Sequence, residues 1–287
     1  MSQPEPVSAP RIAFQGEPGA YSEAALLESA AANGLPLPIP VPCASFEEVF
    51  AAVEQGDCQS GLIPIENSLA GSIHRNYDLL LQHNLHVVGE YYLRVSHCLL
   101  ACPDTPLEAI RKVISHPQAL AQCEQYLRKL NVTIESAYDT AGSAKLISQH
   151  GDCTVAAIAS RRAAEIYNLT ILAESIEDNP ENFTRFLKIA RQPEEPGPDA
   201  KTSIVFSLKN VPGSLFRGMG VFALRDIDLT KIESRPLVGK PWEYFFYIDF
   251  AGSTQDVVVQ RALAHLGELA LYMRILGSYP RHRQVSG

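Results

Sequence analysis

The sequence lacks three features that would each point to a particular class of protein. Its 287 residues contain no apolar run near the roughly 18 residues of a membrane span. Its formal net charge is −8, so it has no basic field for nucleic acid or an anionic membrane. No Cys-x-x-Cys pair occurs among the cysteines, which are Cys43, Cys58, Cys98, Cys102, Cys123 and Cys153. We expect reduced thiols, no nucleic-acid partner and no membrane partner.

Signals for a metal and for export are also missing. His83 and His86 are close in sequence, but no Cys or acidic residue completes a ligand set at a metal-binding spacing, so we expect no metal. Met1–Pro10 has neither the basic start and apolar core of a signal peptide nor the composition of a transit peptide. A cytoplasmic protein is therefore expected. The length suffices for about two globular domains, and a few local Arg residues would suffice for a small anionic ligand.

The main pattern is a repeated junction in which a short apolar strand runs into a polar loop and then a helix. The loops at these junctions are Gly16–Ser22, Glu66–Ser72, Ser115–Leu120 and Asp139–Ala144. Such repeats predict doubly wound α/β sheets, which bind ligands at the carboxyl ends of their strands. The first loop lacks the third glycine of a dinucleotide fingerprint, so no dinucleotide is expected. At the first two junctions, a plain or capped turn is the alternative interpretation. Capping boxes at Ser45–Glu48 and Thr105–Glu108 predict two further helices.

Asn182–Phe186 reads Asn-Phe-Thr-Arg-Phe and continues into an apolar strand. Thr184 offers a hydroxyl that can donate to a departing oxygen, and Arg185 offers a rigid fork of donors suited to a carboxylate. The alternative is an ordinary edge strand with a solvated Arg.

The pattern changes after residue 191. Residues 192–201 form a linker rich in Pro and Glu, which indicates a domain boundary. The following order of expected elements is strand, helix, strand, strand, helix, strand over about eighty residues. This order predicts a ferredoxin-like βαββαβ module. Modules of this shape often pair between subunits, so a homo-oligomer is expected.

Taken in order, these motifs resemble prephenate dehydratase with a C-terminal ACT regulatory domain, over nearly the whole chain. The matching stretches are the four junction loops, Asn182–Phe186, Val211–Leu215 and Glu233–Pro236. The resemblance implies two α/β lobes with the active site in the cleft between them. It implies a tail at 1–10, a catalytic domain at 11–191, the linker at 192–201, an ACT domain at 202–280 and a tail at 281–287. Within the catalytic domain, lobe 1 would comprise about 11–90 and 165–191, and lobe 2 about 91–164.

The resemblance also implies a reaction, the decarboxylating dehydration of prephenate to phenylpyruvate without cofactor or metal. Thr184 would be the proton donor, Arg185 would hold a substrate carboxylate, Phe186 would shape the pocket and Glu66 would support proton transfer. The other expected substrate-binding residues are Ala20, Tyr21, Ser22, Asn67, Ser68, Ser72, Ser115, Gln118, Thr140, Ser143 and Asn182.

L-Phenylalanine is the implied effector of a homodimer or homotetramer. Its expected site is formed by Val211, Pro212, Gly213, Ser214 and Leu215, with Glu233, Ser234, Arg235 and Pro236 at a subunit interface. Ser68–Leu81 and Ile275–Pro280 resemble plant-type sequences that often prefer arogenate, whereas the absence of a transit peptide favours prephenate. A different alternative is a cytoplasmic amino-acid sensor, because two lobes around a cleft are also the architecture of solute-binding proteins.

Overall fold

The computed structural model describes residues 9–237, 239–240 and 242–282 of the chain. The chain divides into two compact units, each made of two segments. The first unit contains Met1–Asn76 and Tyr91–Phe186, and the second contains Tyr77–Glu90 and Leu187–Gly287. The expected tails at 1–10 and 281–287 lie mostly outside the described residues. Among the residues described, no helix has both the length and the apolar character needed to cross a membrane.

The first sheet has the strand order β2-β1-β3-β11-β5, and the short β4 pairs with β3. Its strands are β1 (Arg11–Gln15), β2 (Ile39–Cys43), β3 (Ser60–Asn67), β4 (Gly71–Ser72), β5 (His86–Arg94) and β11 (Phe183–Ala190), and its helices are α1 (Tyr21–Ala32), α2 (Phe46–Gln55) and α3 (His74–Gln82). β2 is an edge strand because Pro40 and Pro42 lack the N–H groups that a second neighbour would need. α2 begins at the predicted cap, where Ser45 Oγ accepts the Glu48 N–H at 3.2 Å.

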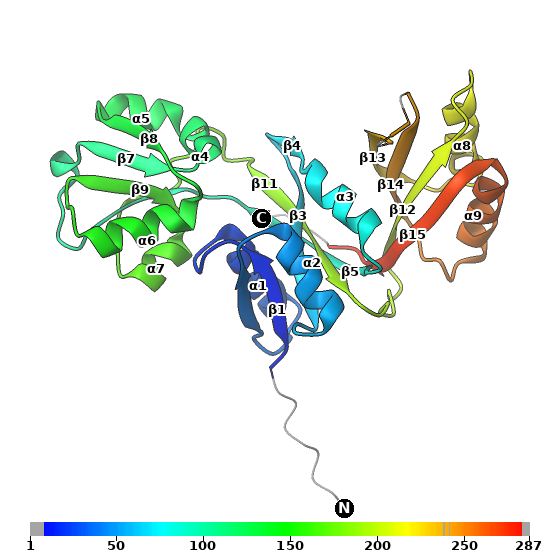
Figure 1. Cartoon of the computed structure of the whole chain (residues 1–287), viewed down its shortest axis with the longest axis horizontal. Coiled ribbons are helices and arrows are strands. Elements are labelled where there is room, and N and C mark those ends of the chain that lie inside the picture. The colour runs from blue at the N-terminus through cyan, green and yellow to red at the C-terminus, as the bar shows by residue number, and fades with distance from the viewer. Residues whose placement is uncertain (1–8, 238, 241, 283–287) are drawn as a thin grey trace, which may run out of the picture. The chain divides into compact units, whose positions relative to one another are not determined.

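The second sheet has the order β10-β6-β9-β7-β8. Its strands are β6 (Cys98–Ala101), β7 (Lys112–Ser115), β8 (Thr133–Ser136), β9 (Val155–Ala159) and β10 (Thr170–Ala173), and its helices are α4 (Pro117–Gln122), α5 (Glu124–Leu130), α6 (Thr140–His150) and α7 (Arg161–Tyr167). One apolar cluster joins α4 and α5 to the sheet, and another joins α6 and α7 to it. Figure 1 shows the sheet between these two pairs of helices.

Two details of this region differ from the prediction. β10 pairs with β6 of the second sheet, so the chain returns to the first sheet only at β11 and not near residue 165. The helix expected after Thr105 is only a 3₁₀ turn, η1 (Leu107–Ala109). The turn is short because Ile110 is buried in the core and the chain enters β7 two residues later.

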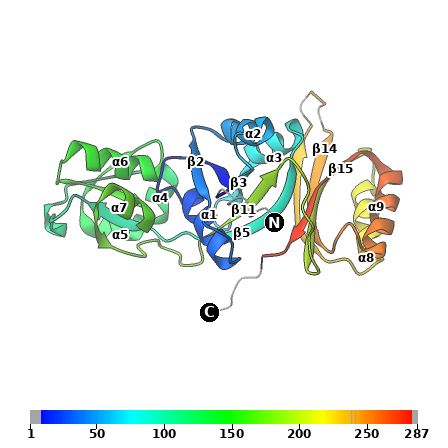
Figure 2. The ribbon, with the colours of Figure 1, turned by 90° about the horizontal axis from the view of Figure 1, so that it is seen from below.

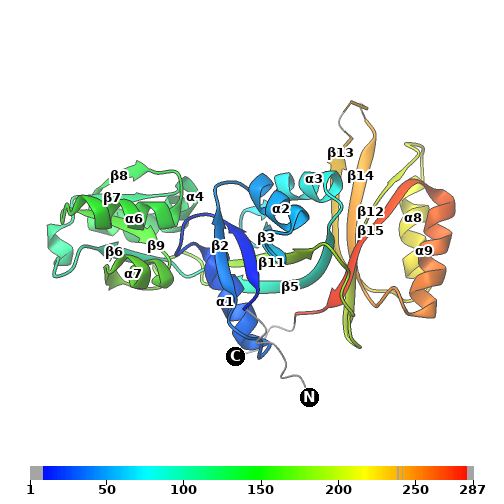
Figure 3. The ribbon, with the colours of Figure 1, turned by 60° about the horizontal axis from the view of Figure 1, so that its bottom comes forward.

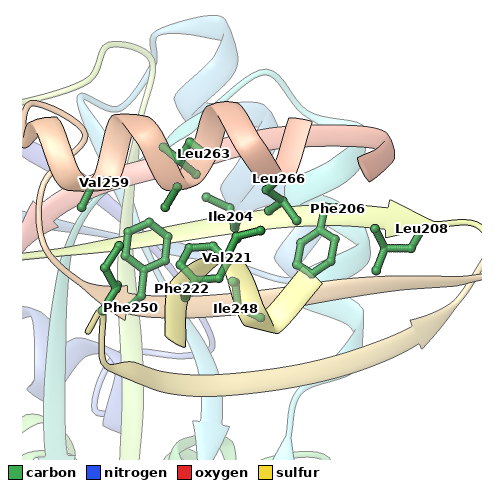
Figure 4. Packing of buried hydrophobic residues seen from close by; sticks show 12 residues of the cluster. Ile204, Phe206, Leu208, Val221, Phe222, Ile248, Phe250, Val259, Leu263 and Leu266 are labelled. Carbon is green, nitrogen blue, oxygen red and sulfur yellow. The ribbon is translucent and has the colours of Figure 1, made fainter. Parts of the chain in front are cut away.

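The second unit contains the predicted βαββαβ order. Its elements are β12 (Ala200–Leu208), α8 (Ser214–Ala223), β13 (Leu229–Pro236), β14 (Tyr244–Ala251), α9 (Val257–Leu269) and β15 (Ala270–Pro280), and its sheet has the order β13-β14-β12-β15. α8 and α9 lie side by side on one face of this sheet (Figures 2 and 3). Between helices and sheet lies a core of rings and branched side chains that includes Phe206, Phe222 and Phe250 (Figure 4).

The second unit also includes part of the segment that was expected to be catalytic. The Tyr247 hydroxyl donates to the Tyr77 carbonyl at 3.0 Å, and Arg274 donates to the Leu80 and Leu85 carbonyls at 3.0 Å. A Cβ on Gly277 would lie 1.9 Å from the Val87 carbonyl oxygen, so β15 can approach β5 this closely only with glycine. Residues 77–90, expected in lobe 1, therefore pack with the C-terminal module, and β5, which begins at His86, is also a strand of the first sheet.

Candidate active site

A cavity of about 240 Å³ lies in the first unit, where the carboxyl ends of strands meet the first turns of helices. Eight of the predicted site residues line it, and they come from all five predicted motifs of the first unit. They are Ala20, Tyr21, Ser22, Asn67, Gln118, Thr140, Thr184 and Phe186. Thr184 and Phe186 point to the same side of β11 because side chains alternate along a strand.

The Asn67 side chain fixes the direction of the Thr184 hydroxyl. Asn67 Oδ1 accepts the backbone N–H groups of Leu69 and Ala70 at 3.1 and 2.9 Å, so the other arm of its amide must be the NH₂ group. This NH₂ group donates to Thr184 Oγ1 at 3.0 Å. Thr184 Oγ1 is therefore an acceptor toward Asn67, and its own hydrogen remains available to a ligand in the cavity.

The same amide begins a chain of hydrogen bonds with one direction. Asn67 Nδ2 also donates to Asn182 Oδ1 at 2.8 Å, and Asn182 Nδ2 donates to Gln122 Oε1 at 3.0 Å. His97 Nε2 lies 2.9 Å from the same Gln122 oxygen. Because the Asn67 amide is fixed by the backbone, each later amide in the chain has only one satisfactory orientation. Asn182, which is fully buried, acts here by orienting its neighbours and does not line the cavity.

His97 and Tyr21 form a buried pair at the wall of the cavity. The Tyr21 hydroxyl lies 2.7 Å from His97 Nδ1 and 3.0 Å from the Ser96 carbonyl, and the rings meet edge to face at 5.4 Å. Burial lowers the pKa of His97 below 6.5, although its bond to Gln122 and the nearby Glu177 oppose the shift. Burial raises the pKa of Tyr21 well above 10. Both side chains are therefore neutral near pH 7.

The first turns of α1 and α6 point at the cavity through Ala20, Tyr21 and Ser22 in α1 and Thr140 in α6. The unpaired N–H groups and the dipole of a helix N-terminus favour an anion. The Gly19 N–H does not add to these donors, because it donates to the buried Glu23 carboxylate at 2.5 Å. None of the described residues that line the cavity is a Lys or an Arg.

Arg185 is placed outside the cavity, contrary to its expected contact with a substrate carboxylate. It precedes Phe186 on β11, so it points to the opposite side of the strand from Thr184 and Phe186. Its side chain is buried, and its guanidinium carbon lies 5.9 Å from the centre of the Tyr92 ring. Glu66 and Ser72, which pair with each other across β3 and β4, also do not line the cavity.

Three predicted serines use their hydroxyls in hydrogen bonds to the backbone and do not line the cavity. Ser68 Oγ donates to a backbone carbonyl at 2.9 Å and accepts the Phe183 N–H at 2.9 Å, which ties its loop to β11. Ser115 donates to the Ile158 carbonyl at 2.6 Å, and Ser143 donates to a carbonyl in its own helix at 2.7 Å. Ser115 and Ser143 are buried and each hydroxyl satisfies a backbone carbonyl, whereas Ser68 is exposed and holds its loop by two bonds to the backbone.

The sequence analysis missed several residues of the cavity wall. They are Gln15, Gly16, Pro64, Ile73, Val95, His97, His116, Ala119, Gln122 and Asp139. Most lie within or beside a motif that had been recognised, so a wider window would have included them. His97 is different, because it lies in the extended crossover before β6, where no turn or cap indicates a site. Within the described ranges, no group of three or more His, Cys, Asp or Glu is placed to hold a metal ion.

A second cavity, of about 410 Å³, lies in the C-terminal module. Val211, Gly213, Ser214 and Leu215 line it, together with the rings of Tyr244 and Phe246 among others. Pro212 and the predicted group Glu233, Ser234, Arg235 and Pro236 do not line it. Arg235 instead forms an ion pair with Asp78 of α3 at 2.8 Å.

Two α/β sheets, a cavity where strand ends meet helix starts, and a ferredoxin-like module are an arrangement typical of enzymes that act on small molecules and carry an appended domain. The family model described as prephenate dehydratase matches residues 12–194. The chain therefore belongs to the prephenate dehydratase family, as the motifs predicted.

Relatives and solved structures support this assignment. The chain is 53% identical over 281 residues to "Arogenate dehydratase/prephenate dehydratase 2, chloroplastic" of Arabidopsis thaliana. This alignment covers 94% of the chain and 72% of the relative. A prephenate dehydratase from Arthrobacter aurescens in complex with L-Phe has a TM-score of 0.85 at 32% identity, over 94% and 90% of the two chains. GqqA, described as a novel type of quorum-quenching acylase, has a TM-score of 0.87 at 35% identity, over 95% and 98%. The predicted two-lobed fold with a C-terminal domain is confirmed.

The expected cytoplasmic location is wrong. Six of the similar Arabidopsis thaliana proteins are named chloroplastic, and this finding contradicts the expectation. The expectation depended on the composition of the first ten residues, and that composition is no guide to the location of this protein.

Proposed function

We propose that the protein is a lyase of phenylalanine biosynthesis that converts prephenate to phenylpyruvate, with arogenate as an alternative substrate. The observation that carries this proposal is the Thr184 hydroxyl, which lines the cavity and accepts a hydrogen bond from the fixed amide of Asn67. Its hydrogen is therefore directed away from Asn67 and can be donated to the oxygen that leaves the substrate ring.

The reaction needs few groups. As the ring carboxylate leaves as carbon dioxide, its bonding electrons enter the ring and the C–O bond breaks, so an aromatic ring forms. The departing hydroxide takes up one proton and leaves as water. A positioned donor typically contributes about 10²–10⁴-fold to such a step, and Thr184 is the donor we assign. Thr184 is a weak acid, so its hydrogen bond must strengthen as negative charge develops on the oxygen.

We place the substrate carboxylates at the first turns of α1 and α6. Both turns line the cavity, and its described lining residues include no Lys or Arg, so we assign the anions to the N–H groups of these turns. Phe186, buried at the cavity wall, would contact the substrate ring. Arg185 would act on the site only indirectly, through the packing of β11.

The test is turnover by the purified full-length chain. Prephenate is added and phenylpyruvate is followed by its absorbance at alkaline pH, while phenylalanine formed from arogenate is measured by amino-acid analysis. We expect turnover of both substrates, because they share the ring, the hydroxyl and the ring carboxylate. Binding of either substrate without turnover would indicate the amino-acid sensor instead. The ratio of kcat/KM for the two substrates decides which is preferred.

We further propose that L-phenylalanine binds in the second cavity and inhibits the enzyme. The N-terminus of α8 lies at this cavity, and its cap residue Gly213 has a left-handed backbone and no side-chain cap. Exposed N–H groups there can hold the carboxylate of an amino acid, and the nearby rings of Tyr244 and Phe246 can contact its side chain. The Arthrobacter aurescens relative was solved with L-Phe, which supports an effector of this kind.

A matched pair of glycine variants tests this effector site. Gly213→Ala places a Cβ at φ +78°, whereas Gly220→Ala lies within α8 with open space around the added methyl group. We expect weaker inhibition by phenylalanine in Gly213→Ala and unchanged inhibition in Gly220→Ala. Inhibition unchanged in both would place phenylalanine in the active-site cavity as a product mimic. Light scattering of the same samples would test the proposed homodimer or homotetramer.

A further inference from the structure

We propose that His97 is a positioning residue for the dehydration, which holds the side chain of Gln122 so that its NH₂ group faces the substrate. This inference rests on the proposed function. It adds a second oriented donor to the cavity, beside the Thr184 hydroxyl.

The geometry places His97 between two residues of the cavity wall. Its side chain is buried, with 2% of the residue exposed, and it lines the cavity itself. Nε2 lies 2.9 Å from Gln122 Oε1 on α4, and Nδ1 lies 2.7 Å from the Tyr21 hydroxyl on α1. The backbone N–H of His97 donates to the buried Glu177 carboxylate at 2.9 Å, which fixes the start of β6.

The hydrogen-bond directions determine which nitrogen of His97 carries the proton. Gln122 Oε1 already accepts from Asn182 Nδ2, so it is the carbonyl oxygen and can only accept from His97. Nε2 must therefore carry a hydrogen. In the neutral ring Nδ1 is then an acceptor, and the Tyr21 hydroxyl that faces it shares its one hydrogen between Nδ1 at 2.7 Å and the Ser96 carbonyl at 3.0 Å.

This arrangement leaves one group of Gln122 for the substrate. Asn182 and His97 together use both lone pairs of Gln122 Oε1. Among the described residues, the Gln122 NH₂ group has no protein partner, and Gln122 lines the cavity. Without His97, one lone pair of Oε1 would be unsatisfied and the amide could rotate away from its productive direction. His97 therefore acts through Gln122 and not by contact with the reacting atoms.

Two substitutions separate the two sides of the ring. His97→Gln places an amide near the former Nε2 position, where it can still donate to Gln122. His97→Asn is shorter, so it can reach only the Tyr21 side. His97→Leu fills the site with neither contact. We expect His97→Gln to retain kcat within about threefold, and the Asn and Leu variants to lose about tenfold or more in kcat with little change in KM.

The pH profile separates positioning from acid–base catalysis. Neutral and protonated His97 both donate from Nε2, so a positioning role predicts the same kcat–pH profile for the parent and His97→Gln. The titratable groups that face His97 are Tyr21 on α1 and Glu177 before β11, and the thiols of Cys98 and Cys123 lie near Tyr21. All of them remain in both proteins, so a difference between the profiles reports on His97 itself.

The outcomes are distinct. Thermal melting of each variant checks that it is folded. If the parent has no dehydratase activity, the proposed function fails. If the parent is active and His97→Leu is equally active, or Gln and Asn lose kcat equally, the positioning role of His97 is overturned. Loss of a limb of the pH profile in His97→Gln would instead make His97 an acid–base catalyst.

Discussion

At the scale of single residues, the direction of one hydrogen bond gives Thr184 its proposed role. Asn67 donates to Thr184 Oγ1, so the threonine is held as a donor toward the cavity. Thr184→Val keeps the shape of the side chain and removes the hydroxyl. We expect kcat to fall by about 10²–10⁴-fold while substrate still binds. Steady-state kinetics and substrate binding to the inactive variant measure the two effects.

The matched control for this prediction is Thr184→Ser, which keeps the hydroxyl and its bond from Asn67. It should retain most of the turnover. A Val variant with near-normal kcat would remove Thr184 from the mechanism and direct attention to Glu66, the other proton donor suggested by the sequence.

Arg185 illustrates how the structure changes a prediction made from a motif. Its charge suggested a contact with a substrate carboxylate, but it is buried beside Tyr92 and does not line the cavity. Arg185→Lys should therefore leave KM within about twofold and lower the free energy of unfolding by about 1–3 kcal/mol. Denaturant unfolding and kinetics check both parts. A KM raised tenfold in a stable variant would restore the direct role in substrate binding.

At the scale of elements, the turn between β1 and α1 depends on close packing. Gly19 has φ +91°, and a Cβ there would lie 2.8 Å from the Cα of Ala163 in α7. Ser160 also donates to the Gly19 carbonyl at 2.6 Å, so the turn is tied to the start of this helix. Gly19→Ala should destabilise the protein by about 1–2 kcal/mol for the backbone and about 1–3 kcal/mol for the clash.

Gly34→Ala isolates the backbone contribution, because Gly34 has φ +63° and nothing within 4 Å of the added Cβ. The difference between the two unfolding free energies then measures the packing of Gly19 against Ala163. Equal losses would mean that α7 moves aside at no cost.

The elements that carried a strong local signal were predicted well. The α2 cap and the C-terminal βαββαβ order depend on residues close in sequence, so both could be recognised. The junctions that hold Asn67 and Thr140 were found because strand ends and helix starts have their own residue preferences.

The prediction of the site failed for residues whose hydrogen-bond partners are distant in sequence or whose side chains point into the protein. His97 acquires its role from Tyr21 and Gln122 on two other elements, and Ser115 was wrongly placed because its hydroxyl turns to a neighbouring strand.

At the scale of the whole molecule, α3 belongs to both compact units. Its first residues, His74–Asn76, lie in the first unit, directly after Ile73 of the cavity wall. From Tyr77 onward the helix packs with the C-terminal module, where Asp78 pairs with Arg235. A change in the module that moves this pair would therefore act on the helix that follows Ile73 of the cavity wall. Coupling of this kind requires that phenylalanine bind one state of the module better than the other.

The pair gives a direct test of that coupling. Its side chains are 23% and 33% exposed, so Arg235→Gln should cost less than about 1 kcal/mol of stability. If the pair transmits regulation, phenylalanine should still bind, as measured by calorimetry, whereas inhibition should require about fivefold or more effector. Lys240→Gln removes another ion pair of the same unit, at 3.6 Å from Glu243, and should leave inhibition unchanged. Parental inhibition in Arg235→Gln would exclude the pair as the coupling element. Complete loss of phenylalanine binding would place Arg235 in the effector site, as its sequence motif suggested.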